Sequence, residues 1–183
     1  MFITDLAQNM EYFRQGLEYL EEYLLSGELY WRLSDLPTLS VGGLLLTKLF
    51  LEVVDLPTPE RNSMNDLIVR YENIKDKWRE AFESKILREI GSRITLWKNY
   101  LEDYWNAPEE YGSAYPQEIR NRVILQLLAV EITRPFKESS EINRLDQKLQ
   151  TRFVAGGFIW QKFLENTFPP IDFWYLYGRL PEK

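Results

Sequence analysis

The stretch from residue 60 to residue 106 contains no proline and carries apolar residues at helical spacing almost throughout. The series runs Leu67, Tyr71, Ile74, Trp78 and Phe82, then Ile90, Ile94, Trp97, Leu101 and Tyr104. Steps of three and four residues place such side chains on one face of an α-helix. The pattern predicts one long helix over about 60–106. Gly91–Ser92 is its weakest point, where we expect the helix either to bend or to break.

The amino-terminal segment predicts a second helix with a broad apolar face. Its seam includes Leu6, Phe13, Leu17, Leu20 and Leu24, and tyrosines beside the seam widen it. A two-stranded coiled coil needs only a narrow stripe, so this width favours a helical bundle. Thr4 is a suitable N-cap and Gly27 a suitable stop.

Three further helices follow from proline boundaries and periodicity. They are expected over about 39–54, over about 116–132, and from Ser139 or Ser140 to the pair Pro169–Pro170. No segment alternates over enough residues to form a central strand. We therefore expect an all-α fold, an irregular bundle of about five helices that forms a single domain over 1–183.

Two glycine pairs, Gly42–Gly43 and Gly156–Gly157, occur in the middle of apolar helical patterns. Glycine is unfavourable inside a helix by about 1 kcal/mol relative to alanine. That penalty suggests that a neighbouring backbone approaches each pair closely.

Missing residue types exclude much chemistry. The chain has no histidine and no cysteine, but it has six Trp, eleven Tyr and ten Phe residues. The commonest general base is absent, and so are the usual zinc and iron ligands. We expect no cofactor and, more generally, no enzymatic activity.

Charge and hydropathy limit the partners. Residues 1–60 contain ten acidic and three basic side chains, and residues 61–106 contain eight acidic and nine basic ones. Nucleic-acid binding needs a basic face, which this balance does not predict. The longest apolar stretch, near 41–54, is too short to cross a bilayer. We expect a cytoplasmic protein with neither nucleic acid nor membrane as partner.

A magnesium site made of carboxylate oxygens is a minor alternative function. Carboxylates at helical spacing can hold Mg²⁺, as in helical nucleotide pyrophosphohydrolases, which pair two such groups. The candidate groups here are Glu18, Glu21, Glu22, Glu52 and Asp55. A solvated acidic face explains the same residues more simply, because such spacing is common in charged helices.

Two aromatic segments outside the regular helices are the candidate ligand site. Each combines large rings with an arginine, a set that suits planar ligands bearing a carboxylate or phosphate. Protein interfaces use the same residue types, and so do segments that close the end of a bundle. We expect the segments to meet; their residues are Tyr30, Trp31, Arg32, Trp174, Tyr175, Tyr177 and Arg179.

The preferred function is a helical interaction protein that binds itself or a protein partner through helix faces. A ligand-binding bundle is the alternative, and a magnesium-dependent nucleotide hydrolase comes third. A helix of 45 or so residues would be about 70 Å long, longer than a compact domain of this size. Because its apolar overhang would need cover, we expect a homodimer.

Overall fold

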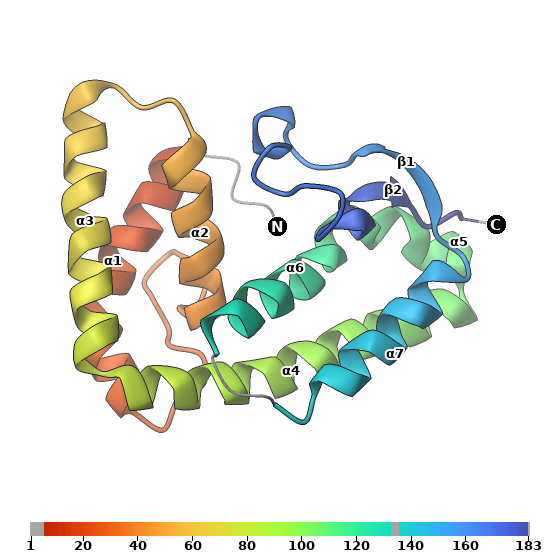
Figure 1. Cartoon of the computed structure of the whole chain (residues 1–183), viewed down its shortest axis with the longest axis horizontal. Helices are drawn as coiled ribbons and strands as arrows, with labels where there is room; N and C mark the ends of the chain where they lie inside the picture. The colour runs from red at the N-terminus through yellow and green to blue at the C-terminus, as the bar shows by residue number, and fades with distance from the viewer. Residues whose placement is uncertain (1–5, 133–135, 183) are drawn as a thin grey trace. The chain divides into compact units, whose positions relative to one another are not determined.

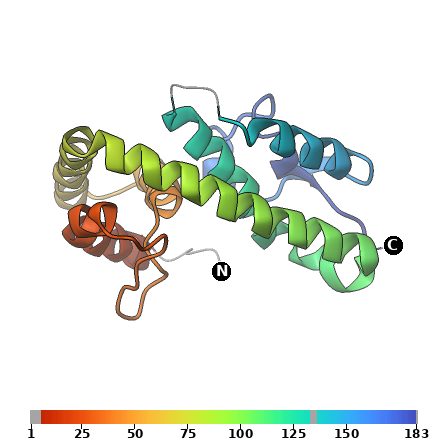
Figure 2. The same ribbon diagram turned by 90° about the horizontal axis from the view of Figure 1, so that it is seen from below.

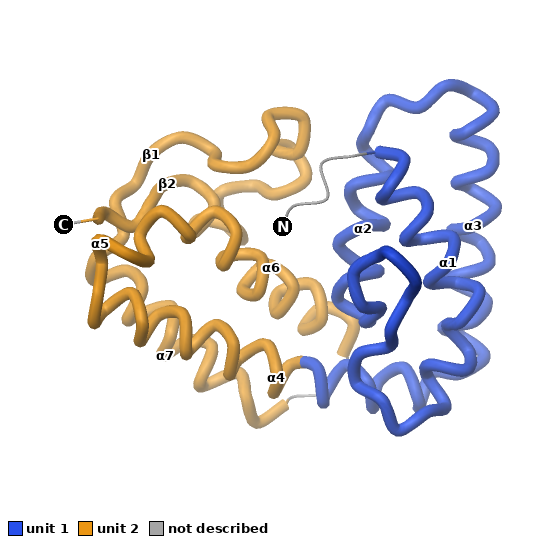
Figure 3. The backbone as a smooth tube through the Cα atoms, turned by 180° about the vertical axis from the view of Figure 1, so that it is seen from behind, with its two compact units in different colours: residues 1–89 blue, residues 90–183 orange. Residues whose placement is uncertain are grey.

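The computed structural model describes residues 6–132 and 136–182, and it is mostly helical, which confirms the all-α prediction. The chain divides into two compact units, Met1–Glu89 and Ile90–Lys183 (Figure 3). The single domain over 1–183 stays a prediction.

The first unit is built from α1 (Leu6–Leu25), α2 (Val41–Val53), α3 (Thr58–Lys77) and the first turns of α4 (Arg79–Asn106). Figure 1 shows α1, α2 and α3 lying beside one another. Aromatic rings join them in the core, where Tyr71 of α3 lies 6.1 Å from Phe13 and 6.2 Å from Phe82 between ring centroids. These rings connect α1, α3 and α4.

The amino-terminal seam is confirmed. Phe13, Leu17, Leu20 and Leu24 are buried, and Leu6 is half-buried. Thr4 lies outside the described residues. The helix ends two residues before Gly27, close to the expected stop.

The long helix breaks at a different place from the predicted one. The break falls at Trp78, whose φ of −115° and ψ of 34° are not helical, and α4 runs unbroken through Gly91 (Figure 2). The prediction of a bend at Gly91–Ser92 is therefore wrong. The overhang of a single long helix, which led us to expect a dimer, disappears with it.

The second unit contains the rest of α4, α5 (Pro108–Tyr111), η1 (Gly112–Ala114), α6 (Tyr115–Glu131) and α7 (Ser139–Gln150). A two-stranded antiparallel sheet follows, made of β1 (Val154–Phe158) and β2 (Tyr177–Arg179). The short helices η2 (Lys162–Leu164) and η3 (Trp174–Leu176) lie between the strands. Ile119 and Val123 of α6 are buried, but Val130 is 74% exposed.

The last predicted helix is too long, because α7 ends at Gln150 and Gly156–Gly157 lie in β1. They fall where the register of the β1–β2 pairing shifts, between Ala155 and Phe158. Gly42–Gly43 do lie in α2, but a Cβ at Gly43 would meet the hydroxyl of Tyr12 at 2.4 Å. A side chain, rather than a backbone, thus requires glycine there.

No helix among the described residues is long and apolar enough to cross a membrane.

Candidate functional site

The first aromatic segment lies in the first unit. Trp31 pairs with Leu39 through two backbone hydrogen bonds, of 3.0 and 2.7 Å, which close the loop between α1 and α2. Its half-buried ring lies 6.4 Å from that of Tyr19. Tyr30 is also half-buried and Arg32 is exposed. The segment therefore presents an arginine and part of an aromatic pair at the surface.

The second aromatic segment lies in the second unit, and most of it is packed. Tyr175 is buried, and Trp174 packs edge-on against Phe153, with ring centroids 5.2 Å apart. The hydroxyl of Tyr177 donates to the carbonyl of Phe168 at 2.8 Å. Arg179 is exposed. Because the two segments belong to different units, their predicted meeting stays a prediction.

A buried ion pair packs against the second aromatic segment, and the sequence did not predict this ion pair. Arg122 of α6 donates two hydrogen bonds to Asp146 of α7, of 2.8 and 2.7 Å. Its guanidinium lies 4.6 Å from the ring centre of Tyr175. Burial opposes the charged form of Arg122, but the bonds to Asp146 and the charge interactions with Tyr175, Asp146 and Tyr115 together raise the pKa. Burial also raises the pKa of Tyr175.

Arg179 lines an open pocket of about 480 Å³. Ser113 and Tyr115 form one part of its lining, and Glu182 contributes an acidic residue to it. Tyr104 holds the chain at this wall, because its hydroxyl donates to the carbonyl of Pro181 at 2.8 Å. The pocket therefore has a positive and a negative group on one fixed segment.

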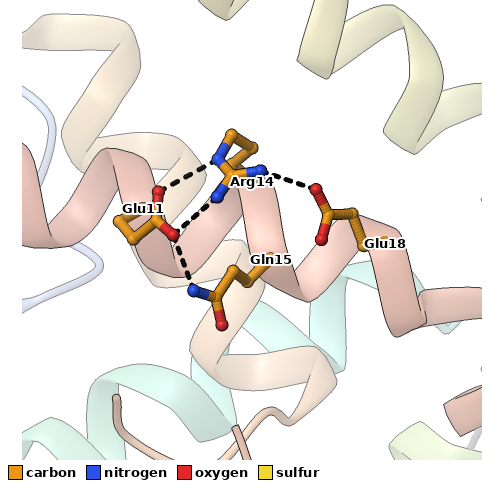
Figure 4. A network of polar contacts seen from close by, with 4 residues as sticks. All are labelled: Glu11, Arg14, Gln15 and Glu18. Carbon is orange, nitrogen blue, oxygen red and sulfur yellow. Dashed lines mark hydrogen bonds and ion pairs between the residues drawn. The ribbon is translucent and has the colours of Figure 1, made fainter. Parts of the chain in front are cut away.

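The candidate magnesium ligands lie in the first unit and do not form a cluster. Glu18 pairs with Arg14 in the network on α1 (Figure 4), and Glu52 pairs with Lys48 at 3.3 Å. Glu22 and Asp55 are exposed. Within residues 6–132 and 136–182, no three acidic side chains come together in a way that suits a metal ion.

Glu21 has a different role, at the junction between α3 and α4. We call this junction, Lys77–Arg79, the elbow. One carboxylate oxygen of Glu21 accepts hydrogen bonds from Lys77 Nζ and from the indole Nε1 of Trp78, both at 2.9 Å. These bonds, that of Lys77 first, lower the pKa of Glu21. The ammonium of Lys77 also lies 5.1 Å from the Trp78 ring centre.

Two hollows adjoin at the elbow and share Lys77 as lining. One, of about 310 Å³, lies between Glu21 of α1 and one stripe of α3, and the other is about 430 Å³. We call them together the furrow. Apolar side chains project into it although they are largely exposed, Leu25 by 57% and Val69 by 60%. The furrow is lined by Glu21, Leu25, Asp66, Val69, Arg70, Asn73, Ile74, Lys77, Trp78, Arg79, Glu80 and Ala81.

The first turns of α4 place buried charges at the ends of two other helices. Lys85 donates to the carbonyls of Ser26 and Glu28, just after α1. Glu89 accepts from the Ser40 hydroxyl at 2.8 Å and from the Gly42 amide at 3.0 Å, at the start of α2. The positive charge of Lys85 stabilises the negative carboxyl end of the α1 dipole, and the negative charge of Glu89 stabilises the positive amino end of the α2 dipole. Their positions next to the fully buried Ile86 and Ile90 place both charges beside the apolar seam of α4.

No protein-family model, no curated protein and no solved structure matches this chain.

Proposed function

We propose that this chain is a non-enzymatic interaction protein that forms a homodimer through helix faces of its first unit. The furrow is the observation that supports the proposal. It combines exposed apolar side chains with a half-buried tryptophan and flanking arginines, the residue types that anchor protein interfaces. Contact with a partner would cover Leu25 and Val69, which water surrounds in the single chain.

Charge favours a second copy of this chain as the partner. The lining of the furrow includes acidic groups, Asp66 and Glu80, and basic groups, Arg70 and Lys77. A twofold dimer places the same surface of both copies together, so the acids of one furrow can face the bases of the other.

Sedimentation at about tens of micromolar, where weak dimers are populated, tests this proposal. We expect a dimer, and we expect Leu25→Asp and Val69→Asp to dissociate it because each would bury a charge. Val130→Asp is the matched control, since Val130 is an exposed helical valine outside the first unit. A monomer at all these concentrations contradicts the proposal.

The pocket beside Arg179 supports a second candidate function, the binding of a small ligand. Its volume lies within the usual range of about 300–1,000 Å³ for ligand sites. Arg179 suits a carboxylate or phosphate. A thermal-shift screen with such compounds tests the site: stabilisation should disappear in Arg179→Gln and persist in Arg32→Gln. Nucleotides with Mg²⁺ belong in the same screen, where a positive result would favour a hydrolase instead.

We also propose that the protein acts in the cytoplasm. A chain without cysteine cannot form the disulfides that an oxidising compartment allows. Fractionation of cells that express the tagged chain is the direct measurement.

A further inference from the structure

The elbow is a break without a breaking residue. Sharp breaks in helices usually follow from proline, glycine or a π-bulge, and the sequence has neither proline nor glycine between Glu60 and Ile90. Helical hydrogen bonds persist on both sides, from the Trp78 amide to the Ile74 carbonyl at 3.0 Å and from the Phe82 amide to the Trp78 carbonyl at 2.9 Å. Local sequence therefore favours a continuous helix, and contacts with other elements must hold the break.

Those contacts are of two kinds. Glu21 holds the elbow itself through Lys77 and Trp78. Beyond the elbow, the first turns of α4 are held by Phe82, which packs edge-on against Tyr71, and by the buried charges of Lys85 and Glu89. The second set joins residues 79–89 to partners in residues 26–71.

We infer that a second copy of this chain supplies the first turns of α4, by an exchange in which each elbow straightens into one continuous helix. This inference rests on the proposed self-association and specifies how it occurs. A partner's Phe82, Lys85 and Glu89 can make the same contacts with α1, α2 and α3, because both copies have the same sequence. The exchange therefore leaves no buried charge without its partner.

The side chains that line the furrow fit this arrangement, although the hollow at the elbow itself is lost when the elbow straightens. In the exchanged dimer, the chain of each copy crosses at its straightened elbow to the other half of the dimer. The two straightened elbows therefore lie next to each other. Leu25 and Ala81, which line the hollow at the elbow, then lie where the second copy can cover them. Trp78 leaves its non-helical φ and ψ values, and the helix gains the regular geometry that its sequence favours.

Cross-linking between different copies distinguishes exchange from simple docking. The chain has no cysteine, so introduced thiols are unique. Arg88 donates to the Gly27 carbonyl at 2.8 Å, and a Cβ at Gly27 meets nothing within 4 Å. Copies with Gly27→Cys and differently tagged copies with Arg88→Cys are unfolded, refolded together and treated with a short bismaleimide. We expect a covalent heterodimer. Gly27→Cys with Val53→Cys serves as the control pair and should give little, because Val53 is exposed at the end of α2 opposite Gly42, which Glu89 contacts.

A proline at the start of α4 gives an independent test. Arg79 is the first residue of α4, where proline is tolerated, but in a continuous helix proline is strongly unfavourable. We expect Arg79→Pro to raise the dimer dissociation constant by about tenfold or more, and Arg79→Ala, which removes the charge but keeps the helix, to have a clearly smaller effect.

The outcomes separate the two proposals. A dimer in sedimentation without the 27–88 heterodimer, and insensitive to Arg79→Pro, overturns the exchange and leaves the docked homodimer standing. A monomer at every concentration, without any cross-linked heterodimer, overturns both. A cross-linked heterodimer together with a weakened Arg79→Pro dimer supports the exchange.

Discussion

Replacing Asp146 by asparagine should strongly destabilise the second unit. The carboxylate accepts both hydrogen bonds from Arg122, and only 7% of the Arg122 side chain and 15% of the Asp146 side chain are exposed. Asparagine keeps the shape but removes the charge, and its amide presents hydrogens to a guanidinium that cannot accept them. Arg122 cannot lose its proton and remains charged in a buried site.

The expected loss follows from the geometry. Removing one partner of a buried ion pair costs about 3–5 kcal/mol. The partial exposure of Asp146 favours the lower end, about 3 kcal/mol. For a chain of this size, each kcal/mol lowers the melting temperature by about 2–4 °C, so the midpoint should fall by about 6–12 °C. Tyr175 loses rigidity at the same time, because Arg122 lies against its ring.

Thermal unfolding followed by circular dichroism and tryptophan fluorescence measures the effect. Glu141→Gln is the control on the same helix, since it removes an exposed pair with Arg144 that water screens, and it should barely move the midpoint. The double variant Arg122→Met with Asp146→Leu should recover most of the loss, because no buried charge remains. A loss below about 1 kcal/mol in Asp146→Asn would refute the view that this pair is tightly bonded and desolvated.

Three other predictions concern glycines and tyrosines. Gly178→Ala should unfold the two-stranded sheet, because a Cβ there would lie 2.3 Å from the Val154 carbonyl oxygen. Gly157→Ala should be tolerated, because a Cβ there would meet nothing within 4 Å. The rate of proteolysis of the carboxyl-terminal segment compares the two variants. Gly91→Ala should stabilise the chain by about 0.5–1 kcal/mol in urea unfolding, because Gly91 lies within α4 and its Cβ would meet open space. If Gly91→Ala destabilised the chain, α4 could not be a regular helix at that point. Burial raises the tyrosine pKa values, so the stability that depends on neutral tyrosine is complete below pH 10 and is lost as the pH rises above it. Absorbance at high pH should show that four buried tyrosines ionise only when the chain unfolds; they are Tyr23, Tyr100, Tyr115 and Tyr175. Ionisation of these tyrosines in the folded state would contradict their burial.

Periodicity predicted the helices well where one apolar face packs on one core. The α1 seam, the α2 segment and the apolar positions of α4 all follow the residue spacing. The break at Trp78 was not predictable, because nothing local marks it and the contacts around it reach distant residues, such as Glu21, which lies 57 residues from Trp78. The end of α7 was missed for a related reason. Helical spacing continues by chance through Gly156, while the pairing of Val154 with Arg179 decides the structure.

The candidate site was predicted less well than the fold. Aromatic content led to the segment around Tyr175, but its rings pack inside the second unit, and the Tyr175 ring covers a salt bridge that composition could not locate. Arg179 of that set lines a pocket. The furrow depends on the elbow, so it could not be predicted from a pattern whose expected weak point was Gly91. Sequence spacing indicates which face of a helix is apolar but not which neighbour leaves that face uncovered.

The charges that α4 places at the ends of α1 and α2 also set an order of events during synthesis. Lys85 and Arg88 contact carbonyls that precede them by 57 to 61 residues, and Glu89 reaches the start of α2 across 47 residues. At about 5–20 residues per second, α1 and α2 leave the ribosome seconds before these groups exist. Until then the carbonyls after α1 and the amide of Gly42 have only water as partner. The first unit can complete its core only when Glu89 has emerged, so a nascent chain that stalls shortly before that residue exposes an unfinished helical face to chaperones and proteases.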